Sequence, residues 1–198
     1  MTKFVGITGG IGSGKTTLSK HLKKLGFLVH ESDSVVSDIY NKPSKPFISF
    51  VKDKISKEAV KKNKVDKKII TNIIFNNPKS KKALEGYIHK EVQASRKAFF
   101  QRNFKKKKKI VFADIPLLIE KKLEKNFDLV ICVISTKKNR TNRVLKNKKF
   151  TKKILNKIFK SQTSDKERKK CSNIIINNNK TKKDFIFNVE KALIEIKK

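Results

Sequence analysis

Five short apolar runs are spaced along the chain, and polar, lysine-rich segments separate them. Each run is too short for a typical buried helix and contains β-branched or aromatic residues, which predicts a buried strand. Strands separated by helices are typical of a parallel sheet covered by helices on both faces. The expected fold class is α/β, with three layers around a five-stranded parallel sheet. The five runs are 3–8 (KFVGIT), 27–32 (FLVHES), 110–116 (IVFADIP), 127–135 (FDLVICVIS) and 173–177 (NIIIN).

The segments between these runs have helical periodicity. Leu18, Leu22 and Leu25 are spaced along one helical face, and Gly26 follows them as a C-cap. The periodicity therefore predicts a helix directly after the first strand. The other helices expected around the sheet are 33–41 (DSVVSDIYN), 117–123 (LLIEKKL), lysine-rich helices over about 137–170, and a final helix opened by the capping-box pair Thr181 and Asp184.

The middle of the chain carries no strand signal. Residues 67–75 (KKIITNIIF) predict a helix that ends before Pro78, and residues 79–102 predict a longer helix with apolar residues along one face. A helical insert therefore interrupts the sheet. The expected organisation is one folded unit, with a core of about 1–40 and 105–198 and an insert of about 41–104.

Residues 9–16 (GGIGSGKT) match the pattern G-x-x-x-x-G-K-[ST] between a predicted strand and a predicted helix. Glycines allow successive backbone N–H groups to turn towards a phosphate, and the helix N-terminus adds partial positive charge. Lys15 supplies a cation, and the Thr16 hydroxyl supplies an oxygen ligand for Mg²⁺. The residues expected to bind ATP here are Gly10, Ile11, Gly12, Ser13, Gly14, Lys15, Thr16 and Thr17.

The sequence does not favour a GTPase. A guanine-reading N/T-K-x-D pattern occurs at 63–66 and 181–184, but a lysine-rich chain produces such matches by chance. The first lies away from any predicted strand end, and the second is explained by the helix cap. D-x-x-G is absent, so a switch that senses the γ-phosphate is not expected.

Carboxylates follow two of the predicted strands. Glu31 and Asp33 follow the second strand, where a kinase would place the group that orients an acceptor hydroxyl and takes its proton. Capping of the next helix is an alternative for Asp33. Asp114 ends another strand, where it could hold Mg²⁺ through water or act as a strand-end cap.

The composition is strongly basic, with 51 Lys and Arg against 17 Asp and Glu and a formal charge of +34. Only five of the basic residues are arginines, and the lysines are spread over almost every segment, which favours solvated faces over a dedicated nucleic-acid site. Cys132 and Cys171 do not suggest a disulfide or a metal site. Because neither a long apolar run nor a signal peptide is evident, a cytoplasmic location without membrane contact is expected.

Several segments together resemble the dephospho-CoA kinase family. They are GITGGIGSGKTT, LGFLVHESD, IFNNP, IHK, IPLLIE and KSQTSDKERKKCSNIIINN, in this order, and the resemblance covers nearly the whole chain. It implies transfer of the ATP γ-phosphate to the ribose 3′-hydroxyl of dephospho-CoA, the last step of coenzyme A synthesis. It also implies a fold similar to nucleoside monophosphate kinases, with a lid at about 138–172.

The resemblance implies roles for single residues. Asp33 matches the acid taken to activate the acceptor, and Arg143 matches a lid arginine. Asn178 matches a residue near the adenine. The residues that match positions on the acceptor side are His89, Pro116 and Leu117.

The chain departs from the family pattern at Glu31, at Lys90 after His89, and at Asn147, where a second lid arginine is usual. These departures affect the acceptor and lid details most. Two other functions remain open from the residues alone: a kinase for a nucleoside or nucleotide, and a nucleic-acid-associated ATPase. The expected partners are ATP, Mg²⁺ and dephospho-CoA, with no specific nucleic acid, and the expected assembly is a monomer or small homo-oligomer.

Overall fold

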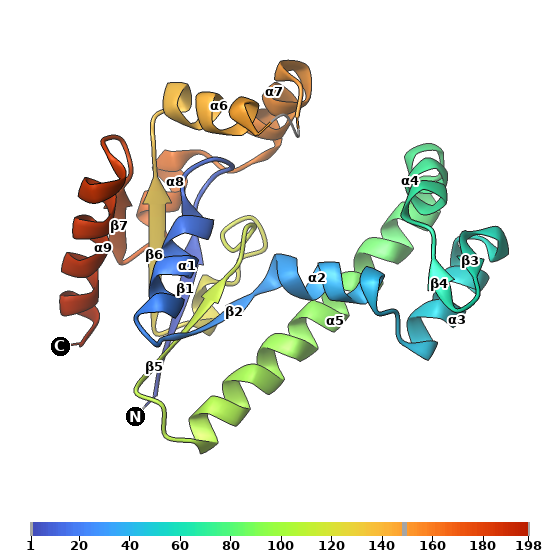
Figure 1. Cartoon of the computed structure of the whole chain (residues 1–198), viewed down its shortest axis with the longest axis horizontal. Helices are drawn as coiled ribbons and strands as arrows, with labels where there is room; N and C mark the ends of the chain where they lie inside the picture. The colour runs from blue at the N-terminus through green and yellow to red at the C-terminus, as the bar shows by residue number, and fades with distance from the viewer. Residues whose placement is uncertain (1, 148–149, 198) are drawn as a thin grey trace. The chain divides into compact units, whose positions relative to one another are not determined.

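The structure is a computed structural model that describes residues 2–147 and 150–197 (Figure 1). The chain forms two compact units, Met1–Glu31 with Arg102–Lys198, and Ser32–Gln101. Each unit has its own hydrophobic core. The second unit begins before residue 41, the expected start of the insert, because Ile39 and Tyr40 already pack on its core.

The first unit is built on a five-stranded parallel sheet, which confirms the expected fold class. Its strand order is β2-β5-β1-β6-β7, with β1 in the centre. The carboxyl ends of the strands meet along one edge, because Glu31 and Ile7 both pair in register with Asp114, and Thr8 pairs with Cys132. The strands are β1 (Lys3–Thr8), β2 (Leu28–Glu31), β5 (Ile110–Asp114), β6 (Leu129–Ile134) and β7 (Ile174–Asn177).

One face of this sheet packs on α1 (Lys15–Lys24) and α9 (Lys182–Lys197). Alternate strand residues such as Val5, Ile131 and Val133 point into this core together with Leu18, Leu22 and Phe185. Buried Cys132 alternates with Ile131 and Val133 and so lies on the opposite face, where α8 (Asp165–Lys170) packs against β6. Burial raises the pKa of the Cys132 thiol to about 11, so this cysteine is a neutral core residue.

The helix expected at 117–123 is wrong. The segment after β5 is a series of turns, followed by a 3₁₀ helix, η2 (Glu124–Asn126). Its bonds mix three spacings: the N–H groups of Lys121, Lys122 and Leu123 donate to the carbonyls of Leu117, Ile119 and Leu118. Lys122 has a φ of 51°, which a continuing helix cannot accommodate. The segment carries apolar residues because its turns pack on the core, where Leu118 is fully buried. This apolar pattern resembles one face of a helix.

The lysine-rich region forms α6 (Lys137–Lys146), α7 (Lys152–Ser161) and α8, as expected. Each begins at a hydroxyl N-cap: the side chains of Thr136, Thr151 and Ser164 accept from the N–H three residues further on. The capping box of α9 is also confirmed, because Thr181 and Asp184 exchange side-chain and backbone hydrogen bonds of 3.1–3.2 Å.

The second unit contains α2 (Ser32–Asn41), α3 (Lys45–Lys54), the 3₁₀ helix η1 (Lys57–Ala59), α4 (Lys67–Asn76) and α5 (Pro78–Lys105) up to Gln101. Its core is centred on one buried aromatic ring. The Phe47 ring, 1% exposed, lies 5.6 Å from the ring of Tyr40 and 5.3 Å from that of Tyr87. Leu84, on the predicted apolar face of α5, is also buried there.

The expectation of a strand-free insert is wrong in one place. A two-stranded antiparallel hairpin joins β3 (Val60–Lys61) to β4 (Lys64–Val65) between η1 and α4. The two turn residues, Lys62 and Asn63, have φ angles of 47° and 59°, as a tight hairpin requires. Asparagine adopts this conformation readily, but lysine rarely does, so the residue types here do not indicate the turn.

Candidate functional site

The glycine loop lies at the carboxyl edge of the sheet, between the central strand β1 and α1. Its residues line a pocket of about 310 Å³, together with Arg143, Val144, Asn147 and Phe150 from α6 and the segment that follows it. The pocket therefore contains every loop residue from Ile11 to Thr17, all of which were expected to bind ATP. Gly10 lies directly before them, at the start of the turn.

Gly14 ends the loop and caps α1 in a left-handed conformation, with a φ of 116°. A Cβ at this position would clash with the side-chain amide of Asn178. Glycine is therefore required both by the backbone angle and by the close approach of Asn178. This geometry directs the first turn of α1, with the positive end of the helix dipole, towards the pocket.

Lys15 folds back across the loop, and its Nζ donates to the carbonyl of Gly9 at 2.7 Å. Thr16 follows in the first turn of α1 and lines the same pocket. The cation and the hydroxyl expected from the sequence are therefore both at the loop.

Arg143 and Asn178 lie together behind the loop. The Asn178 Nδ2 donates to the carbonyl of Ser13 at 2.7 Å. Arg143 Nη2 donates to the backbone carbonyl of Asn178 at 2.8 Å, and its Nη1 donates to Ser135 Oγ at 3.1 Å and to the carbonyl of Gly12 at 3.4 Å. In this arrangement the guanidinium connects α6 to the loop and to the ends of β6 and β7.

A second hollow, of about 850 Å³, lies beside Asn178 and Arg143. It is strongly basic, because four lysines line it with Thr17, His21, Phe185 and Ile186. The lysines come from α1 and from the region around the start of α9, and they are Lys20, Lys24, Lys180 and Lys182. Sequence reasoning identified Asn178 here but none of the lysines, whose number elsewhere in the chain hides them.

Asp114 ends β5 and accepts a hydrogen bond of 2.9 Å from the hydroxyl of Ser19, a fully buried residue of α1. Its carboxylate is thus held against the helix that the glycine loop starts. Glu31, its neighbour in register on β2, forms an ion pair with Lys23 of α1.

The expected acceptor residues fall in both units. Asp33 is exposed in the first turn of α2, and His89 is exposed on α5, so both belong to the second unit. Pro116 and Leu117 lie in the turns after β5, in the first unit.

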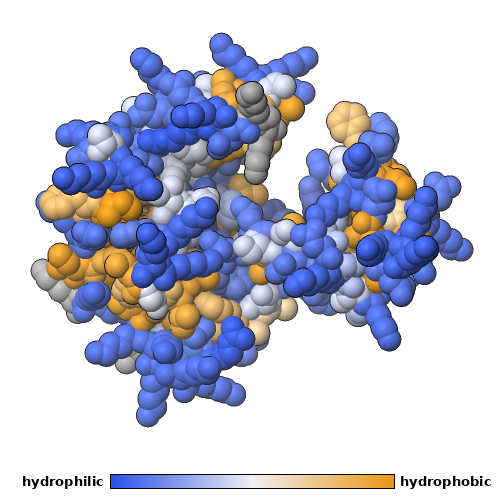
Figure 2. Space-filling model, in the orientation of Figure 1, coloured by the Kyte–Doolittle hydropathy of each residue, from blue (hydrophilic) through white to orange (hydrophobic). Residues whose placement is uncertain are grey.

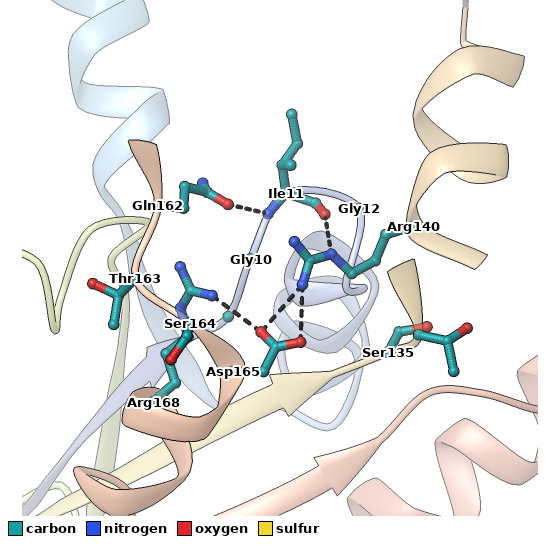
Figure 3. Close-up of polar contacts among 12 residues, drawn as sticks. Gly10, Ile11, Gly12, Ser135, Arg140, Gln162, Thr163, Ser164, Asp165 and Arg168 are labelled. Atoms are coloured by element: carbon teal, nitrogen blue, oxygen red, sulfur yellow. Dashed lines mark hydrogen bonds and ion pairs between the residues drawn. The ribbon is translucent and has the colours of Figure 1, made fainter. Parts of the chain in front are cut away.

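A group of charged residues lies beside the loop, and sequence reasoning matched Glu120 and Arg168 to the family pattern without a role and missed Arg140 and Asp165 (Figure 3). Arg140 is 7% exposed and Arg168 is 1% exposed, and both donate to the carboxylate of Asp165 at 3.0–3.1 Å. Arg168 also donates to Glu120 Oε1 at 2.7 Å. The available signal was the rarity of arginine: Arg140 and Arg143 lie three residues apart on one helix of a chain whose other cations are nearly all lysines.

Burial disfavours the charged form of Glu120, but other interactions outweigh it. The carboxylate accepts from the N–H of Thr163 at 3.0 Å and faces the Arg168 guanidinium, which together hold the pKa of Glu120 below its ordinary value. Glu120 therefore remains a carboxylate and an ion-pair partner at neutral pH.

Comparison with known proteins identifies the relatives of this chain. Residues 3–184 match the family model for dephospho-CoA kinase. A dephospho-CoA kinase of Fusobacterium nucleatum is 36% identical over 192 residues, covering 95% of both chains. One of Bartonella quintana is 32% identical over 178 residues, covering 90% of both chains.

Solved structures agree. A dephospho-CoA kinase from Campylobacter jejuni superposes with a TM-score of 0.75 at 27% identity, covering 99% of this chain and 98% of the other. A shikimate kinase from Acinetobacter baumannii has a TM-score of 0.51 at 14% identity, covering 99% of this chain and 93% of the other, which shows a shared fold alone.

Proposed function

This chain belongs to the dephospho-CoA kinase family and phosphorylates dephospho-CoA with ATP, and we propose that the acceptor atom is the ribose 3′-hydroxyl. The observation that supports this most directly is the glycine loop at the centre of a parallel sheet, with Lys15, Thr16 and Arg143 around one pocket. Such a loop binds a nucleoside triphosphate through its backbone N–H groups, and the acceptor approaches from the carboxyl edge of the sheet.

On the nucleotide side, the loop amides and Lys15 bind the β- and γ-phosphates. The lysine-rich hollow beside Asn178 extends from Thr17, so we propose that it receives the nucleoside end of ATP. The Arg143 guanidinium donates to four acceptor atoms of the protein. Its proposed contact with the transferred phosphoryl group therefore requires some of these bonds to be exchanged when the nucleotide binds.

The residues present fit Mg²⁺. The Thr16 hydroxyl and the Asp114 carboxylate are oxygen donors, as Mg²⁺ prefers, and Asp114 is held against the same helix that carries Thr16. We propose that Thr16 binds the ion directly and Asp114 through water. When bound, Mg²⁺ supplies positive charge between the β- and γ-phosphate oxygens.

On the acceptor side, we propose that Asp33 aligns the 3′-hydroxyl and accepts its proton as the phosphoryl group leaves ADP. His89, Pro116 and Leu117 are proposed to bind other parts of dephospho-CoA. Two of these four residues follow the sheet strands closely in sequence: Asp33 comes two residues after β2, and Pro116 comes two residues after β5.

The Asp33→Asn variant tests the proposal. Removal of the proton acceptor is expected to lower kcat by about 10²- to 10⁴-fold with little change in ATP affinity. The measurement is coenzyme A formation in steady state beside ATP binding by calorimetry, and Asp38→Asn, an exposed carboxylate further along α2, is the control. Substantially retained turnover in Asp33→Asn would remove this residue from the mechanism.

ATP hydrolysis stimulated by RNA without any acceptor would instead support a nucleic-acid-associated ATPase.

A further inference from the structure

Ile11, the third residue of the glycine loop, is held on both sides by side chains from elsewhere in the chain. Its N–H donates to Gln162 Oε1 at 3.0 Å, and its carbonyl accepts from Arg140 Nε at 3.1 Å. Figure 3 shows the two side chains approaching the loop from opposite directions. The peptide groups of a glycine-rich loop rotate easily, so the loop has little preference for one backbone conformation. Two hydrogen bonds at one residue therefore hold the loop in a single conformation.

Arg140 is itself rigidly placed. Its guanidinium binds both oxygens of Asp165 and lies over the Phe159 ring, 4.8 Å from the ring centroid. It also lies so close to Gly10 that an added Cβ would be 2.8 Å from its Cζ. The glycine before Ile11 therefore serves the approach of Arg140 as well as the turn.

Gln162 lies at the end of α7, in an extended conformation that terminates the helix. The residues after it are held in turn, because Thr163 N–H binds Glu120, and Asp165 binds both Arg140 and Arg168. Gln162 is thus attached to a fixed segment and reaches the loop from there. Its amide oxygen is neutral, so it accepts from Ile11 without placing negative charge beside a loop that binds phosphates.

We propose that Gln162 is a positioning residue for phosphoryl transfer: its bond to the Ile11 N–H holds the first half of the glycine loop in the shape that receives ATP. This inference rests on the proposed function for its reaction, but its effect is on the nucleotide side. A loop that must be ordered on binding lowers affinity, and a loop that samples several shapes lowers the fraction of productive complexes.

The test is Gln162→Leu, which keeps a side chain of similar bulk and removes the acceptor. The amide of Ile11 is expected to exchange its hydrogen about 5- to 10-fold faster, because one hydrogen bond is lost. The kcat/KM for ATP is expected to fall about 10-fold while the KM for dephospho-CoA changes little. Ser161→Ala is the matched control, because the hydroxyl of this exposed neighbour donates to the carbonyl of Ile158 in its own helix.

A purely structural role would lower the melting temperature but leave ATP affinity and the Ile11 amide unchanged at 25 °C, and this result would overturn the proposal. If Gln162→Leu does not fold, Gln162→Asn carries the same expectation, since its amide is one methylene shorter. Calorimetry with ATP alone separates the two hypotheses. If the proposed acceptor is wrong, the wild-type protein forms no coenzyme A. If the proposed role of Gln162 is wrong, Gln162→Leu binds ATP as tightly as the wild type.

Discussion

Gly14 occupies the point where the glycine loop, α1 and Asn178 meet. The Asn178 amide reaches the carbonyl of Ser13 only because Gly14 has no side chain in its path. Arg143 then binds both the backbone and the side chain of Asn178. The shape of the glycine loop therefore depends on residues from α6 and from the end of β7 as much as on its own glycines.

Gly14→Ala is expected to destabilise the protein by roughly 2–4 kcal/mol, because it adds backbone strain and displaces a buried amide from its partner. ATP affinity should fall with it. Thermal unfolding and ATP calorimetry measure the two effects. Gly26→Ala is the control: its φ is also positive, at 81°, but an added Cβ meets nothing within 4 Å. Equal losses of ATP affinity in both variants would contradict the role of Asn178.

The elements on the outer side of the sheet are joined by ion pairs. α8 carries Arg168, which lies between Asp165 of its own first turn and Glu120 from the turns after β5. An almost fully buried guanidinium needs both carboxylates, because an unpaired buried charge is costly. The same Asp165 binds Arg140 of α6. Three separate elements are therefore fixed relative to one another within the first unit.

This network predicts a pH dependence of stability. The folded protein lowers the pKa of Glu120 below its ordinary value of 4.5, so its stabilising effect is complete above that value and is lost as the pH falls through the folded pKa. Glu120→Gln should destabilise the protein by roughly 1–3 kcal/mol at pH 7. The difference from wild type should shrink as the pH falls through the folded pKa of Glu120, because both side chains are neutral below it.

Thermal unfolding across this pH range measures the difference. Glu85→Gln, which replaces an exposed carboxylate of α5, is the control and should have little effect at any pH. A difference between wild type and Glu120→Gln that does not change with pH would show that the charge of Glu120 is not what stabilises the network.

At the scale of the whole molecule, each of the two units is stabilised by its own hydrophobic core. The first unit buries mainly aliphatic residues between a sheet and two helices, and the second buries Phe47 among aliphatic side chains and partly buried aromatic rings. Phe47→Ala removes a ring from the centre of the second core and should cost about 3–5 kcal/mol there. ATP binding, which we propose to use residues of the first unit, should remain within about twofold.

Hydrogen exchange resolved by segment measures this effect. We expect loss of protection within residues 32–101 and little change in β1, β5 and β6. Phe75→Ala, at an exposed position of α4, is the control. Equal loss of protection in both units would show that the two cores unfold as one.

The high charge of the molecule is carried mainly by lysine at its surface. Figure 2 shows hydrophilic side chains over most of the visible face of both units. Three of the five arginines have instead been placed in polar contacts around the glycine loop, where a planar guanidinium can bind several acceptors at once. The lysines attract anionic substrates over long range, and salt should weaken this attraction.

In the described residues, no helix is long and apolar enough to cross a membrane.

Local sequence patterns determined the elements of this protein and its phosphate-binding loop. Apolar runs and helical periodicity predicted five strands and most helices, because these signals depend on neighbours within a few residues. The same reasoning failed at 117–123 and at the β3–β4 hairpin. At both places a lysine adopts a positive φ, and the residue type does not predict this conformation.

Only the tertiary structure decided the strand order and the environment of the loop. Ile11 is held by Arg140 and Gln162, which are 129 and 151 residues away in the chain. No periodicity links such positions, because their approach depends on how α6 and α7 pack at the edge of the sheet. The sequence predicted a phosphate-binding loop after β1, and long-range packing determined which side chains contact that loop.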